Sequence, residues 1–298
     1  MKNLKNSIVA ICLFAFVSMF AQTNPKVNFK TVTPETAIND ISYQYLLGDK
    51  VFLRETPSRD AKRLAILSIG TKLMLCDKSE EEEIINGISS HWYEVKVGEY
   101  TGWVWGGLIA QKTFGSQAYH NVKFAYGFER ANVNEDGSLE QKHQLRAYKN
   151  GVQVGKIVFD GHQSTALNME NIGNKGLYNV EDIIALDVPG TNDAQSKGKM
   201  YIFWNNGRFT NVATLMDHAN TSYSKTESFV FPSDMEGKKS TITLKTFITT
   251  HKAVAENDKA TSEKELIVSL YKWDGNKLVP KEVLPTISNN TMASTNNF

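Results

Sequence analysis

The sequence predicts an all-β protein, with a small N-terminal β-module followed by a larger, mostly antiparallel β-domain. Apolar and polar residues alternate in many short segments, as at Val122, Phe124, Tyr126 and Phe128, and this period of two is typical of half-buried strands. Segments with the helical period and capping residues are nearly absent. Aromatic segments also run into Asn-Gly or Asp-Gly pairs, which favour tight hairpin turns.

Three such aromatic segments lie in the second half of the chain, and they end at Gly151, Gly207 and Gly275. Their unequal spacing is too irregular for a solenoid or a regular propeller. It favours hairpins within one sandwich-like domain, and a degenerate blade-like array is the alternative. Residues 183–186 and 201–204 lack alternation, so we expect central strands buried on both faces, with Trp204 in the core.

Composition and charge exclude several classes of protein. Hydrophobic residues make up 41% and charged residues 22% of the 298 residues, which are values for a globular protein, not a disordered one. The formal net charge is +1, so there is no electrostatic footprint for nucleic acid. No nucleic-acid partner is expected.

The N-terminal residues are typical of a signal peptide for export. Lys2 and Lys5 precede an apolar run at residues 8–20, which is short for a membrane span but suits the core of a signal peptide. We expect cleavage after Ala21, an exported protein (periplasmic, at the cell surface or secreted) and no membrane insertion afterwards; a retained anchor is the alternative. Cys12 lies within this signal.

Cys76 is the other cysteine of the chain, so we expect no intrachain disulfide in the mature protein. It lies in a strand-like run, and the simplest interpretation is a small buried hydrophobic residue. A catalytic nucleophile would need an activating partner such as histidine.

Changes in composition suggest a domain plan. It has a signal at 1–21, a polar leader at 22–45, a dense strand-rich module at 46–111, a β-rich domain at 118–285 and a flexible tail at 286–298.

The module at 46–111 carries four motifs in order: Leu-Arg-x-x-Pro at 53–57, a leucine-rich segment ending in Gly70, Trp-Tyr-x-Val at 92–95 and Gly-Trp-Val at 102–104. Together they resemble the bacterial SH3-like (SH3b) domain, which implies a small barrel. Domains of this kind often bind cell-wall peptides or target wall hydrolases. The acidic insertion at residues 80–83, before Asn86-Gly87, departs from the pattern and is interpreted as a solvated loop.

The Gly98-Glu99 pair predicts a type II′ turn and thereby a strand register. In that register Tyr93 faces Val104 on the barrel core side. The other face pairs Trp92 with Trp105, Glu94 with Trp103 and Lys96 with Thr101. Three of the five tryptophans of the chain would then lie on one outer face, and something must cover them.

Two covers are possible for this aromatic face. One is internal, either the leader around residues 41–47 or the C-terminal domain. The other is a ligand, because flat aromatic rings beside a carboxylate suit peptides and sugars. The candidate ligand-binding residues are Trp92, Trp103, Trp105, Glu94, Arg54 and Tyr93.

No catalytic motif is present: there is no His-Glu-x-x-His pair, no Gly-x-Ser-x-Gly elbow and no phosphate-binding loop. The stretch at 132–137 resembles a calcium loop, but His143 stands where a bidentate glutamate is required, so a polar hairpin turn is expected. Residues 181–187 are the other acidic stretch that could hold calcium, but they lack the regular aspartate spacing of a calcium-binding loop. We expect no metal, no cofactor and no enzymatic activity.

These observations favour an exported non-catalytic binding protein whose SH3-like domain contacts an envelope component, such as a peptidoglycan peptide or glycan. A structural or interaction protein is the first alternative, in which the barrel docks on its own C-terminal domain or on an envelope partner protein. A cell-wall hydrolase with an unrecognised active site is the second.

Overall fold

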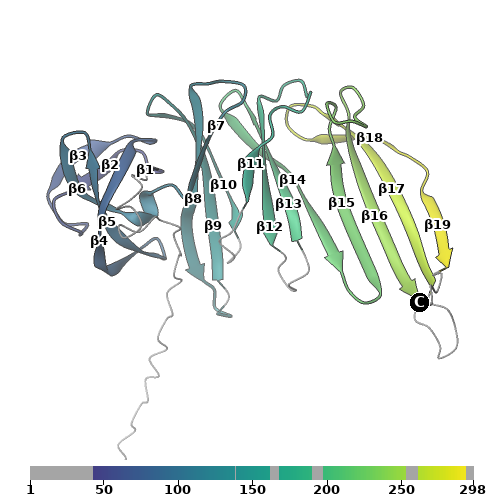
Figure 1. Ribbon diagram of the computed structural model, residues 1–298, viewed down its shortest axis with the longest axis horizontal. Helices are drawn as coiled ribbons and strands as arrows, with labels where there is room; N and C mark the ends of the chain where they lie inside the picture. Colours follow the sequence, from purple (N-terminus) through teal and green to yellow (C-terminus); the bar gives the residue numbers. More distant parts are fainter. Residues whose placement is uncertain (1–42, 138, 162–167, 190–196, 253–260, 293–298) are drawn as a thin grey trace, which may run out of the picture.

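The computed structural model describes residues 43–137, 139–161, 168–189, 197–252 and 261–292, and it confirms the all-β fold (Figure 1). Across these residues the strands form three antiparallel sheets, and the only helical element is a short 3-10 turn, η1 (Gly106–Leu108). The N-terminal sheet stands at one end of an elongated molecule, and the other strands follow it along the long axis. The predicted signal and cleavage site lie outside the described residues.

The N-terminal module is a curled six-stranded sheet in the order β1-β4-β5-β6-β2-β3. Its strands are β1 (Tyr43–Tyr45), β2 (Val51–Arg54), β3 (Arg63–Leu67), β4 (Lys72–Ile85), β5 (Ile88–Val97) and β6 (Tyr100–Trp105). The concave side buries a core that includes Leu53, Leu73, Val95 and Val104. The sheet includes β1, so the end of the stretch expected to be leader, 22–45, forms a strand.

The β5–β6 hairpin has the predicted register. Trp92 pairs with Trp105, Glu94 with Trp103 and Tyr93 with Val104. Gly98 has a φ of +58°, and Glu99 is not among the residues of positive φ, as a type II′ turn requires.

The acidic insertion is a strand and not a loop, which corrects the expectation from sequence. Residues 80–83 belong to β4, which pairs with β5 as far as Ile85 opposite Ile88. Asn86 and Gly87 both have positive φ and close this long hairpin as a type I′ pair. The strand forms because its backbone pairs with β5, although half of its side chains are charged.

Cys76 is exposed, so the expectation of a buried small residue was wrong. Leu73 and Leu75 take the inward positions of β4. Cys76 falls at a register shift between Leu75 and Asp77, where an extra residue is left out of the pairing.

A four-stranded sheet in the order β10-β9-β8-β7 follows the module. Its strands are β7 (Lys112–Gly115), β8 (Val122–Val133), β9 (Leu139–Lys149) and β10 (Val152–Gly161). The stretch at 132–137 ends β8 and enters the turn to β9, where the Gly137 N–H donates to Asn134 O (3.0 Å). The expected polar hairpin turn is present.

The third sheet has nine strands. They are β11 (Met169–Asn171), β12 (Asp182–Pro189), β13 (Lys197–Asn205), β14 (Arg208–Ala219), β15 (Tyr223–Val230), β16 (Ile242–Lys252), β17 (Thr261–Trp273), β18 (Leu278–Val283) and β19 (Ile287–Met292). The strands run in sequence order to β18, and β19 pairs with β17. A strand therefore stands within the segment expected to be a flexible tail.

This third sheet makes two layers of the stack (Figure 1). β14 and β15 share only two residue pairs, near Ala219, so β11–β14 and β15–β19 can separate and pack face to face. One face of β12 and β13 packs on β8–β10 through Ile184, Ile202 and Trp204. The opposite face packs on β15–β17 through Ile183 and Phe203. These strands are buried on both sides, as predicted, and the packing is sandwich-like.

Two of the three aromatic segments form the tight hairpins that were expected. Asn150-Gly151 and Asn206-Gly207 have positive φ at both residues and connect directly paired strands. The third differs, because Trp273 pairs with Leu278 and a longer loop intervenes. Asp274 closes that loop by accepting hydrogen bonds from the N–H groups of Asn276 and Lys277 (both 2.8 Å).

Candidate functional site

The paired tryptophans of the module are covered by the chain itself. Trp92 and Trp105 are each 4% exposed, and they pack with Phe128 and Ala131 of β8 and with Ile88. Of the two covers that the sequence left open, the structure shows the internal one. Among the described residues, the cover comes from β8 of the C-terminal domain.

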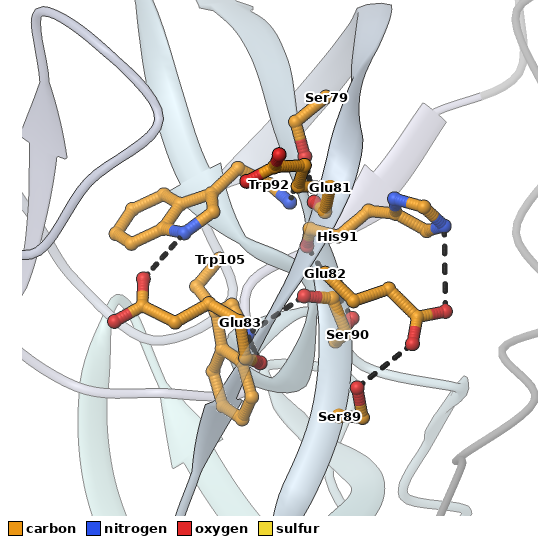
Figure 2. Close-up of polar contacts among 9 residues, drawn as sticks. All are labelled: Ser79, Glu81, Glu82, Glu83, Ser89, Ser90, His91, Trp92 and Trp105. Atoms are coloured by element: carbon orange, nitrogen blue, oxygen red, sulfur yellow. Dashed lines mark hydrogen bonds and ion pairs between the residues drawn. The ribbon is translucent and has the colours of Figure 1, made fainter.

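The indole N–H groups are also satisfied within the module (Figure 2). Trp92 Nε1 donates to the Glu83 carboxylate (2.7 Å), and Trp105 Nε1 donates to the carbonyls of Glu83 (3.1 Å) and Ser90 (3.2 Å). Arg59 forms an ion pair with the same Glu83 carboxylate. The extended β4–β5 hairpin therefore supplies the hydrogen-bond acceptors for both indole N–H groups.

Glu82 and Ser89 extend this polar edge. The Ser89 hydroxyl donates to Glu82 (2.8 Å), and His91 Nε2 lies 3.5 Å from the other Glu82 oxygen (Figure 2). Sequence reasoning missed the roles of Glu82 and Glu83. The signal that could have shown them was Asn86-Gly87, a strong hairpin turn that follows Ile84-Ile85 and precedes Ile88.

The six candidate ligand-binding residues are therefore split by the fold. Trp92, Trp105 and Tyr93 are buried, the last at 3% exposure in the module core, and buried side chains offer no surface to a ligand. For these three, the structure shows packing roles. Trp103, Glu94 and Arg54 are half-buried, and their contact with a ligand stays a prediction.

These three half-buried residues form one row across neighbouring strands. Arg54 pairs with Trp103, and Trp103 pairs with Glu94. Directly paired residues of an antiparallel sheet point to the same face. The row is extended by Arg63, the partner of Arg54, and by Asp77, the partner of Glu94. We call these five residues the cross-strand row; it has cations at one end, tryptophan in the middle and carboxylates at the other end.

The cationic end of the cross-strand row is held in place by local contacts. Arg54 Nη1 donates to Ala61 O (2.7 Å), which also anchors the loop between β2 and β3. The Arg63 guanidinium lies 4.0 Å from the centroid of the Phe52 ring, and that of Arg54 lies 5.7 Å from it. Such cation–π contacts orient both charges without neutralising them.

Cys76 lies beside the cross-strand row, next to Asp77, but its environment opposes reactivity. Partial burial and then the nearby Glu94 carboxylate raise the pKa of the Cys76 thiol. A raised pKa leaves less thiolate at neutral pH, and thiolate is the nucleophilic form.

We therefore expect Cys76 to react with iodoacetamide at pH 7 more slowly than free cysteine does, despite its exposure. The rate should rise steadily with pH, because the thiolate fraction grows, and it should level off only above the usual thiol value of about 8.5. The measurement is modification followed by mass spectrometry, with Cys76→Ser as the control. Rapid labelling at pH 7 would show an activated thiol and contradict this interpretation.

Asp182 has a structural role in the middle layer. The side chain is fully buried (0% exposed), and it accepts hydrogen bonds from the Gln117 N–H (2.7 Å), from Asn171 Nδ2 (2.7 Å) and from the Ser116 hydroxyl. These bonds fix the connection between β7 and β8 to the edge of β11–β12. Within the described ranges no group of three or more His, Cys, Asp or Glu side chains could hold a metal ion.

No family model, no curated protein and no solved structure matches the chain. In the part of the chain that the structure describes, no helix is long and apolar enough to cross a membrane. The functional proposal therefore depends on the geometry of the module and of the layers behind it.

Proposed function

We propose that this chain is an exported, non-catalytic binding protein of the cell envelope, and that its SH3-like module contacts a peptidoglycan peptide or glycan. The observation that carries the proposal is the cross-strand row. Trp103 is the one tryptophan of the aromatic face that β8 leaves half-exposed, and it lies between a guanidinium and a carboxylate.

The spacing of this row suits a ligand with two opposite charges. Arg54 and Glu94 are two strand spacings apart, or about 10 Å, and the row from Arg63 to Asp77 spans about 19 Å. A short peptide with a carboxylate at one end and an ammonium group at the other can reach both charges and lay its middle on Trp103. Wall peptides carry both kinds of group.

The packing supports a rigid platform for such binding. Because β8 covers Trp92 and Trp105, the module is attached to the layered domain through a desolvated aromatic contact in addition to the chain connection. The same contact favours the alternative of a structural or interaction protein, in which the cross-strand row is only a solvated surface.

A pull-down on purified cell-wall material separates these proposals. We expect the mature wild-type protein to bind, and Trp103→Ala to weaken binding about tenfold or more, as for an aromatic anchor at an interface. Tyr100→Ala is the matched control, because Tyr100 is an exposed aromatic residue (57%) at the tip of the same hairpin. It should bind as the wild type does.

Thermal melting of both variants shows whether a loss of binding reflects lost structure. Equal wall binding by Trp103→Ala and the wild type, or no binding by either, would contradict the proposal and leave the structural role. Zymography on the same material tests for hydrolysis, and we expect no clearing.

A further inference from the structure

A cavity of about 620 Å³ lies in the layered domain, away from the module. It is formed by the turn between β11 and β12, the turn before β16 and the ends of β17 and β18. The residues that matter for recognition are Tyr178, Asn179, Ser240, Lys272, Trp273 and Asp274. Its volume lies within the range of small-molecule sites.

The walls of this cavity combine two aromatic rings of different kinds. Trp273 is 8% exposed and belongs to the core between the last two layers, and its indole nitrogen has no hydrogen-bond partner among the described residues. Tyr178 is 85% exposed. A tyrosine so exposed adds little to the core, and its place at the rim of a cavity suits contact with a ligand.

The backbone around the cavity is held in an unusual conformation. Asn179 has a φ of +59° and Ser240 a φ of +55°. Asparagine adopts this left-handed region more readily than other residues with a side chain, whereas for serine it is uncommon, and strained positions of this kind cluster at functional sites. Both of these residues line the cavity and come from different turns.

The two turns are also clamped to each other. Lys175 forms an ion pair with Asp234 (3.0 Å), and the Ser233 N–H donates to Lys175 O (3.1 Å). The cavity is therefore preformed, which lowers the entropic cost of binding.

The polar groups of the cavity balance in charge. Lys272 supplies one cation and Asp274 one anion, and Asn179 and Ser240 are neutral donors and acceptors. The backbone N–H groups of Lys277 and Asn276 lower the pKa of Asp274, so this carboxylate is an ionised acceptor at neutral pH. A neutral ligand rich in hydroxyl groups matches this lining better than a charged one.

We propose that this cavity is a second binding site, for a neutral saccharide of one or two rings. The apolar face of a sugar ring packs against Tyr178 and against the part of Trp273 that lines the cavity, and its hydroxyl groups exchange hydrogen bonds with Asn179, Ser240 and Asp274. This site shares no residue with the cross-strand row and does not depend on the proposed function of the module.

Isothermal titration calorimetry on the full mature chain tests the proposal, with the N-acetylglucosamine disaccharide, maltose and cellobiose as probes. We expect at least one of the three to bind. Tyr178→Ala and Asn179→Gly should each weaken that binding about tenfold or more. Glycine accepts the left-handed conformation of Asn179, so this second variant removes the amide and keeps the turn.

Met235→Ala is the control, because Met235 is fully exposed on the adjoining turn and does not line the cavity. It should bind like the wild type, and so should Trp103→Ala. The proposal is wrong if none of the three sugars binds at millimolar concentration, or if the two cavity variants bind as well as the wild type. Loss of sugar binding in Trp103→Ala alone would place the saccharide on the module instead.

Discussion

Trp105→Ala is expected to lower the free energy of unfolding by about 3–5 kcal/mol, the range for emptying a buried aromatic site. Trp105 is 4% exposed and packs against Trp92 and Phe128. The substitution also removes the donor to the carbonyls of Glu83 and Ser90. The substitution therefore weakens contacts within the module as well as the contact between the module and β8.

Urea denaturation measures this effect. Trp105→Phe keeps an aromatic ring and should cost clearly less than the alanine variant. Tyr100→Ala is the control, because an exposed ring on the same strand should change stability by about 0.5 kcal/mol or less. If Trp105→Ala is as stable as the wild type, the ring is not buried in solution and the module is not packed on β8.

Asp182→Ala is expected to cost a similar amount, about 3–5 kcal/mol, for an electrostatic reason. Its carboxylate is the common acceptor for Ser116, Gln117 and Asn171 in a fully buried position. Alanine removes the acceptor that these three donors share, and a hydrogen bond to a charged group contributes about 1.5–3 kcal/mol. Asp182→Asn should cost less, because the amide keeps one acceptor oxygen.

Asp187→Ala is the matched control for this prediction, since Asp187 lies on the same strand and is half-exposed beside Lys199 (3.6 Å). A surface pair of this kind contributes at most about 1 kcal/mol. Thermal melting or urea denaturation compares the three variants. Equal stability of Asp182→Ala and Asp187→Ala would contradict the anchoring role of Asp182.

The sequence predicted those parts of the structure that local chemistry controls. Glycine in a two-residue turn sets the strand register, so Gly98-Glu99 was enough to pair Trp92 with Trp105. Unbroken apolar runs mark strands buried on both faces, and Trp204 is in the core as expected.

The features that the sequence did not predict depend on contacts between distant segments of the chain, which local patterns do not show. Residues 80–83 belong to a strand because Glu82 and Glu83 pair with His91 and Ser90 of β5, and a run of like charges does not show such pairing. Cys76 is exposed because a bulge shifts the register of β4, and one sequence rarely shows where a bulge will fall. The cover over Trp105 comes from Phe128, far along the chain, through a contact that no local pattern encodes.

The most direct test is an NMR measurement of the tryptophan indole N–H signals during titration with soluble wall peptides. The structure predicts that the N–H groups of Trp92 and Trp105 exchange slowly with solvent, because Glu83 and Ser90 accept them in a buried site. The proposed function predicts that the Trp103 signal shifts on titration and that those two do not. Fast exchange of Trp92 and Trp105, or no shift of Trp103 at saturating peptide, would contradict the proposal of a module sealed on β8 that binds through the cross-strand row.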